Sequence, residues 1–255
     1  MKIGGFGRIK DYSQISSAGF DFAELDIPEI AGLSEDALQA FQNEVSKGIP
    51  VTIGSRLLPV TDPLFFSPGF SPESLHPYLE KACQKTAQLG IQAVILGNGK
   101  ARSLPSGTAV KDESLFIDSL RMMAQETAKN KQILILEPLG PKYSNYINTI
   151  AQAVQLIEKA GLDNVFTMAD LRHMVGTKES FQDIATYLPY IRHIHIDYPL
   201  SYPERRYPSA QDNYDYAPFL NSLELADYHG TMTIEADIPD DWNRAYSQIA
   251  EIMAL

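Results

Sequence analysis

The sequence contains a single cysteine, Cys83, so no disulfide can form within the chain. Chains without disulfides are typical of a reducing compartment. The sequence also lacks an uninterrupted apolar run of about 18 residues, the length that a membrane-spanning helix requires. Strand-like residues follow Met1 directly, without the basic and apolar regions of a secretion signal. We therefore expect a cytoplasmic protein with no membrane partner.

Basic residues are scarce relative to acidic ones. The chain has 21 Lys and Arg against 32 Asp and Glu, which gives a net charge of −11 at pH 7. Nucleic acids are polyanions that proteins bind largely through Lys and Arg. The charge balance therefore disfavours a nucleic-acid partner and favours an enzyme that acts on a small molecule.

A dinucleotide-binding fingerprint is missing as well. Such a fold places Gly-x-Gly-x-x-Gly directly after its first strand. The glycines near the N-terminus, in Gly4-Gly5-Phe6-Gly7, form a shorter motif with different spacing. This difference weakens the case for a dinucleotide-binding sheet.

The sequence does contain eight short apolar runs separated by helix-like stretches. Several are apolar on both faces, as parallel strands are when they are covered on both sides. Strands that alternate with helices over 255 residues predict a single TIM-type (β/α)₈ barrel domain spanning residues 1–255, with a doubly wound sheet as the alternative. The eight runs are Lys2–Phe6, Phe20–Ile27, Ile49–Gly54, Ile91–Gly97, Ile133–Glu137, Val165–Asp170, Ile191–Asp197 and Thr231–Ala236.

The stretches between the runs carry helix signals. Ser71 and Pro72 suit the N-cap and first position of a helix that Gly90 ends. The longest irregular stretch, residues 197–214, lies between the seventh run and its helix, and long loops in compact domains are often functional. We expect the last helix to turn one apolar face inward, made of Trp242, Tyr246, Ile249 and Met253.

The last four runs each end in a potential metal ligand: Glu137, Asp170, His195 and Glu235. In a TIM barrel the C-terminal ends of the strands carry the active site, and side chains alternate along each strand. Three carboxylates that share one buried pocket either have raised pKa values or are neutralised by a cation, and one divalent metal ion is the simpler solution. Three oxygen ligands and one imidazole suit one divalent ion, Mn²⁺, Mg²⁺ or Co²⁺, with Zn²⁺ as an alternative. We therefore predict that these four residues bind one metal ion.

Each of these residues also has an ordinary structural interpretation. A single glutamate at the end of a strand is usually a loop charge or a partner of a helix cap. A single histidine on a strand is more often a hydrogen-bonded core residue, and we assign that role to His193. The metal site is favoured because four such groups fall on consecutive strand ends.

Five motifs follow one another between residues 97 and 235. They are Gly97-Asn98-Gly99-Lys100-Ala101-Arg102, Glu137-Pro138-Leu139, Asp170-Leu171-Arg172-His173, His193-Ile194-His195 and Ile234-Glu235. In this order they resemble motifs of the xylose isomerase-like TIM barrel superfamily, especially its sugar phosphate isomerase/epimerase and ketose 3-epimerase group. The first ninety residues agree with that group only in their pattern.

The resemblance implies a metal-dependent isomerase or epimerase that acts on a small sugar or sugar phosphate. It implies that the metal ligands Glu137 and Glu235 also move protons. One would take a proton from the carbon beside the carbonyl, giving a cis-enediolate, and the other would return a proton to the opposite face. His173 would contact a substrate oxygen, and either Arg205 or Arg206 would clamp the sugar or its phosphate.

Four further residues are candidates for the substrate pocket. Lys100 and Arg102 are candidates for meeting a phosphate, and Glu24, which follows an early apolar run, is a candidate for entering the pocket. Tyr143 stands where the epimerases that the chain resembles have a second glutamate, six residues after the position of Glu137. This departure leaves the identity of the substrate open.

Three other functions fit parts of the sequence. A lyase of the inosose dehydratase type would use the same metal and base, and a sugar-binding barrel without catalysis would explain Tyr143. An AP endonuclease needs histidines at the early strand ends, where this chain has none, and the net charge also argues against it. Dimers or tetramers are common in such families, so a homo-oligomer stays open.

Overall fold

The computed structural model describes residues 1–105 and 113–254, and these form a closed barrel of eight parallel strands. The strands follow one another in sequence order, and β1 pairs with β8 to close the barrel. The predicted (β/α)₈ barrel is confirmed. The strands are β1 (Lys2–Gly7), β2 (Phe22–Asp26), β3 (Val51–Ser55), β4 (Ala93–Leu96), β5 (Ile133–Leu136), β6 (Val165–Asp170), β7 (Ile191–Ile196) and β8 (Thr231–Ile234).

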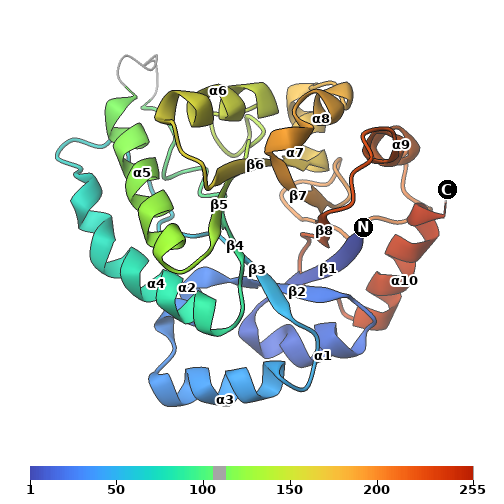
Figure 1. The fold of residues 1–255 in the computed structure, drawn as a ribbon. Coiled ribbons are helices and arrows are strands. Elements are labelled where there is room, and N and C mark those ends of the chain that lie inside the picture. Colours follow the sequence, from blue (N-terminus) through green and yellow to red (C-terminus); the bar gives the residue numbers. More distant parts are fainter. Residues whose placement is uncertain (106–112, 255) are drawn as a thin grey trace.

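Helices surround the barrel in a ring (Figure 1). In the described ranges, no helix combines the length and apolar character needed to cross a membrane. The α-helices are α1 (Tyr12–Ser17), α2 (Ile27–Gly32), α3 (Glu35–Val45), α4 (His76–Gln88), α5 (Ser114–Lys129), α6 (Ile150–Ala160), α7 (Leu171–Thr177), α8 (Gln182–Thr186), α9 (Ala217–Leu225) and α10 (Trp242–Met253). Short 3₁₀ helices are η1 (Ile9–Asp11), η2 (Pro72–Leu75) and η3 (Leu188–Tyr190).

Two helix predictions need correction. The helix expected to start at Pro72 is split into η2 and α4, and the Ser71 hydroxyl contacts Glu73 instead of capping the backbone. In α10, Trp242 and Ile249 are buried as expected, but Met253 is 41% exposed because the helix ends there, beyond the barrel wall.

The barrel interior is filled in layers. An apolar layer consists of side chains from five strands: Phe22, Ile53, Ala93, Ile95, Ile135 and Met168. The ring of Phe22 occupies the space that a side chain at Gly4 would need, so only glycine fits at that position of β1. Two residues after Phe22 on β2, Glu24 lies in a buried polar layer with His195 of β7, nearer the C-terminal ends of the strands.

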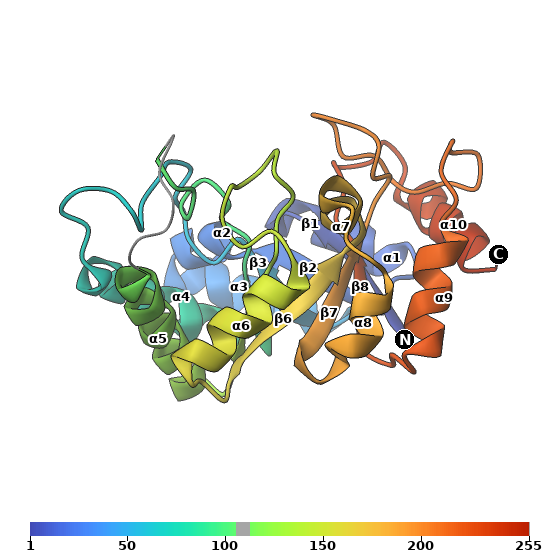
Figure 2. The same cartoon turned by 90° about the horizontal axis from the view of Figure 1, so that it is seen from above.

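Long loops rise from the side of the barrel where the strands end (Figure 2). The loop between β7 and α9 confirms the irregular stretch expected at residues 197–214. Its middle is attached to the segment that follows β8. The backbone of Arg205 exchanges hydrogen bonds with Asp237, which follows β8: Asp237 N donates to the Arg205 carbonyl at 2.7 Å, and Arg205 N donates to Asp237 Oδ2 at 2.9 Å. The barrel scaffold therefore fixes where the Arg205 side chain starts.

Candidate metal and active site

The structure brings together the four residues expected to bind a metal. One ligand atom from each of Glu137, Asp170, His195 and Glu235 lies within 4.8 Å of the others. His195 Nδ1 is 3.6 Å from Glu137 Oε1, 3.7 Å from Asp170 Oδ2 and 3.2 Å from Glu235 Oε2. Asp170 and His195 are directly paired in the register of β6 and β7. The four side chains therefore surround one point at the C-terminal ends of β5 to β8.

The polar atoms at this point suit a cation. Glu137 Oε1 and His195 Nδ1 are buried and have no hydrogen-bond partner among the described residues. Glu235 Oε2 likewise lacks a well-formed hydrogen bond there, although Arg205 lies beside it as an ion pair. Buried acceptors left without a partner are costly. Since these acceptors face one another, a single divalent ion would satisfy all of them at once.

The charge around the point is strongly negative. The buried Arg172 and the partly exposed Arg205 face a larger number of acidic groups. Charges in a low-dielectric interior must be balanced by opposite charges or by proton uptake. A divalent cation would supply the missing positive charge. The acidic side chains gathered here are Glu24, Glu137, Asp170, Asp197 and Glu235.

The protonation preferences of the site follow from burial and charge. Burial raises the pKa of Asp197 to about 7, although Arg205 and Arg172 both favour its ionised form. Burial also disfavours the ionised forms of Asp170 and Glu235, but neighbouring cationic groups outweigh it and hold both pKa values below their usual range. These two carboxylates are therefore ionised at neutral pH, which is the form that binds a metal.

A cavity of about 300 Å³ opens above the four residues. His173 lies at its wall, with Nε2 3.6 Å from Glu137 Oε1. The ring of Tyr143 packs edge-on against His173 with centroids 4.9 Å apart, and its buried hydroxyl has no hydrogen-bond partner among the described residues. Of the predicted substrate contacts, His173, Tyr143, Lys100 and Arg205 line this cavity.

The structure distinguishes the two neighbouring arginines. Arg205 lies over the site, with NH1 2.5 Å from Glu235 Oε2 and NH2 3.4 Å from Asp170 Oδ2. The Arg206 side chain is 61% exposed and instead pairs with Asp212 at 3.0 Å. Successive residues of an extended segment point in opposite directions, so only one of the two can face the cavity. Of the two predicted alternatives, Arg205 lines the cavity, whereas Arg206 lies outside it in this structure.

Arg102 also has a different role from the one predicted. Its side chain is fully buried and donates to backbone carbonyls of Leu96, Glu137 and Ile147. Burial lowers its pKa to about 10. The guanidinium satisfies carbonyls at the ends of β4 and β5, where the strand ladder stops, so it holds the backbone of a ligand and does not reach a phosphate. Nearby, Glu137 occupies the space that a side chain at Gly97 would need.

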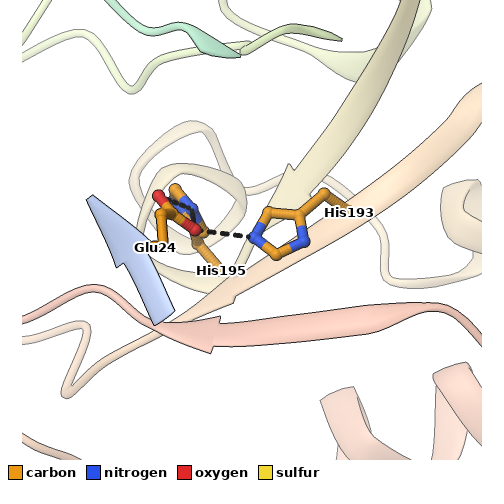
Figure 3. A group of neighbouring side chains, drawn as sticks. All are labelled: Glu24, His193 and His195. Carbon is orange, nitrogen blue, oxygen red and sulfur yellow. Dashed lines mark hydrogen bonds and ion pairs between the residues drawn. The ribbon is translucent and has the colours of Figure 1, made fainter. Parts of the chain in front are cut away.

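Glu24 does not enter the cavity. It is fully buried beneath His195 and contacts both histidines of β7 (Figure 3). Glu24 lies inside the barrel because it is on the same face of β2 as Phe22, which precedes it by two residues and lies deeper in the barrel. His193 is the buried core histidine that the sequence predicted, with Nδ1 2.7 Å from the Thr231 hydroxyl.

Two buried residues near the site were missed. Asp197 follows His195 by two positions and so shares its face of the chain, which was a usable signal. Arg172 lies inside a quoted motif and donates to Asp197 Oδ2 at 2.6 Å, to the Tyr198 carbonyl at 2.8 Å and to Ser201. No feature of the sequence indicated that Arg172 would anchor the loop after β7. Four polar residues of the cavity wall were also missed: Ser55, Arg56, Lys142 and Tyr202.

A family model described as xylose isomerase-like TIM barrel matches residues 12–254. The 3-dehydro-D-guloside 4-epimerase of Escherichia coli (strain K12) is 27% identical over 137 residues, which are 53% of this chain and 50% of that protein. The chain thus aligns with about half the length of this curated relative.

Two solved structures share the fold over nearly their full length. The 3-keto-D-glucoside 4-epimerase from E. coli, in its apo form, has a TM-score of 0.81 and 21% identity, with all of both chains covered. A D-psicose 3-epimerase studied with D-fructose has a TM-score of 0.78 and 19% identity, covering 99% of this chain and 90% of the other. Because the family model spans almost the whole chain, the protein belongs to the xylose isomerase-like TIM barrel family.

Proposed function

We propose that this protein is a metal-dependent sugar epimerase or isomerase that moves a proton at a carbon beside a ketone. One observation carries the proposal: Glu137 and Glu235 lie within reach of one ion, around buried acceptors that lack hydrogen-bond partners among the described residues. The relatives named above support it, since a 3-keto sugar 4-epimerase inverts a carbon next to a ketone.

Four residues would hold the ion: Glu137, Asp170, His195 and Glu235. A bound divalent cation would polarise the ketone and stabilise the negative charge that develops on its oxygen. Mn²⁺, Mg²⁺ and Co²⁺ fit a set of three carboxylates and one imidazole, and Zn²⁺ is the alternative.

The two glutamates would move the protons. Glu137 follows β5 and Glu235 follows β8, so they approach the cavity from different strand ends. One would accept the proton of the carbon beside the ketone, which gives a cis-enediolate, and the other would deliver a proton to the opposite face. The Arg205 guanidinium at 2.5 Å helps keep Glu235 ionised before the reaction.

Polar side chains of the cavity wall would hold the sugar. The Tyr143 hydroxyl has no hydrogen-bond partner among the described residues and can donate a hydrogen bond to a substrate oxygen, whereas an ionised glutamate can only accept one. Three cationic side chains, Arg56, Lys100 and Lys142, also line the cavity. They make it worthwhile to test sugars with and without a phosphate group.

The direct test is solvent exchange at carbon. Free and phosphorylated ketoses and 3-keto glycosides are incubated in D₂O with the protein and Mn²⁺, and deuterium uptake is followed by NMR and mass spectrometry. We expect uptake at one carbon beside the ketone, because both glutamates exchange their protons with solvent. Chelation should abolish the uptake, and Mn²⁺ or Co²⁺ should restore it.

The same spectra separate the alternatives. Epimerisation conserves mass apart from the deuterium, whereas a dehydratase product is lighter by one water. Exchange that survives complete removal of metal would rule out the proposed mechanism. A barrel that only binds sugar would give no exchange with any of these compounds.

Replacement of Glu137 by Gln tests its role in proton transfer. Glu137→Gln removes the carboxylate but keeps the shape beside Gly97, and loss of a positioned base lowers turnover by about 10²–10⁴-fold. We expect the rate of deuterium exchange to decrease by a factor in that range. Sugar binding, measured by calorimetry with Mn²⁺ present, should be weakened less. Unchanged exchange would show that Glu137 moves no proton.

The adjacent arginines form a matched pair. Arg205→Met should lower kcat/KM by about 10²-fold, because it removes the guanidinium that pairs with Glu235 and Asp170 beside the cavity and so disturbs the position of the reacting groups. Arg206→Met removes the same charge from the exposed side of the same loop and should leave kcat/KM nearly unchanged. Steady-state kinetics on the substrate found by exchange would check both variants. Equal effects of the two changes would contradict the assignment of Arg205.

A further inference from the structure

A second group of side chains lies directly beneath the proposed metal ligands. Glu24 of β2 points between His193 and His195 of β7 (Figure 3). Glu24 Oε2 is 3.0 Å from His193 Nε2, and the two carboxylate oxygens are 3.1 Å and 3.2 Å from His195 Nε2. All three residues are at most 1% exposed. Glu24 and His193 are therefore enclosed inside the barrel, beneath the cavity whose wall includes His195.

The atoms of this lower group already have partners. Glu24 accepts hydrogen bonds from both imidazoles and from the Ser55 hydroxyl. His193 uses its second nitrogen, Nδ1, at 2.7 Å from the Thr231 hydroxyl. Glu137 Oε1 and His195 Nδ1 in the upper group have no such partners among the described residues. The lower group thus forms a satisfied hydrogen-bond network, whereas the upper group presents free acceptors.

The network fixes which nitrogen of His195 carries the proton. An ionised carboxylate only accepts hydrogen bonds, so the nitrogen that faces Glu24 must donate. That nitrogen is Nε2, so in the neutral imidazole, which is the form that binds a metal, the lone pair of Nδ1 is directed at Glu137, Asp170 and Glu235. A histidine whose far nitrogen donates to a carboxylate is a better metal ligand and is held in one orientation.

We propose that Glu24 is a positioning residue: it holds His195 in the tautomer and ring orientation that bind the metal through Nδ1. His193 completes the arrangement. Its Nε2 donates to Glu24 while its Nδ1 accepts from Thr231, which keeps the carboxylate turned toward His195. This inference rests on the proposed function, because it requires a divalent ion at the upper group.

Metal affinity is the first test. Glu24→Gln has nearly the same volume, but it removes the negative charge and replaces one acceptor oxygen by an NH2 group, which places a donor against the groups that now donate to Glu24. Loss of such a second partner typically weakens metal binding about 10–100-fold. We therefore expect calorimetry with Mn²⁺ to show one bound ion per chain in the unchanged protein. In Glu24→Gln the Kd for Mn²⁺ should be higher than in the unchanged protein by a factor in that range.

Glu126→Gln is the matched control. Glu126 is a 2% exposed glutamate of α5 that contacts His76 Nε2 at 3.2 Å, outside the cavity and the metal-binding group. The same chemical change beside a histidine there should leave the Kd for Mn²⁺ unchanged. A loss of affinity in both variants would point to a general effect of removing a buried charge and would overturn the role of Glu24.

The unchanged protein provides a second readout that needs no variant to fold. With Mg²⁺ bound as a diamagnetic probe, ¹⁵N-correlated NMR of the histidine rings should show His195 protonated at Nε2. A proton on Nδ1 would overturn the proposal.

The outcomes separate this proposal from the function on which it rests. If the unchanged protein binds no divalent ion, both fall. If it binds one ion and Glu24→Gln binds as tightly, only the positioning role of Glu24 falls. Two ions per chain, one of them lost in Glu24→Gln, would make Glu24 a ligand and would also overturn the positioning role.

Discussion

The site depends on the burial of several negative charges at one end of a barrel. Carboxylates in such surroundings are tolerated only when cations or protons balance them, because the low dielectric penalises unpaired charge. Arg205 and Arg172 provide part of the balance, and the loop after β7 exists in its observed form because these two guanidinium groups hold it. A divalent ion among the four strand-end residues would complete it.

The residues of the site are supported by successive layers of side chains along the barrel axis, from the N-terminal to the C-terminal ends of the strands. An apolar layer that includes Phe22 separates the polar residues from the N-terminal end, and Glu24 then supports His195 from below. The ligands follow at the strand ends, and the loops after β4, β5 and β7 close the cavity above them. Each layer restricts the next, so the ligand geometry is set by the scaffold and not by the loops alone.

The sequence was sufficient for the fold and for the meeting point of the four strand-end residues, since both follow from periodicity and from the two-residue repeat of a strand. It did not separate Arg205 from Arg206, because the direction of a side chain in an irregular loop depends on tertiary anchors such as Asp237. It also assigned Arg102 and Glu24 to the pocket, because no local sequence pattern distinguishes a charged side chain buried inside the protein from one that lines the cavity.

The most direct measurement is the location of an ion in crystals grown or soaked with Mn²⁺, by anomalous diffraction. The account predicts one anomalous peak per chain, bounded by Glu137, Asp170, His195 Nδ1 and Glu235. The ligand distances should be about 2.0–2.3 Å, as for oxygen and nitrogen ligands of divalent ions. A fully occupied peak elsewhere, or a structure in which the four side chains remain around the same point with no ion despite millimolar Mn²⁺, would contradict it.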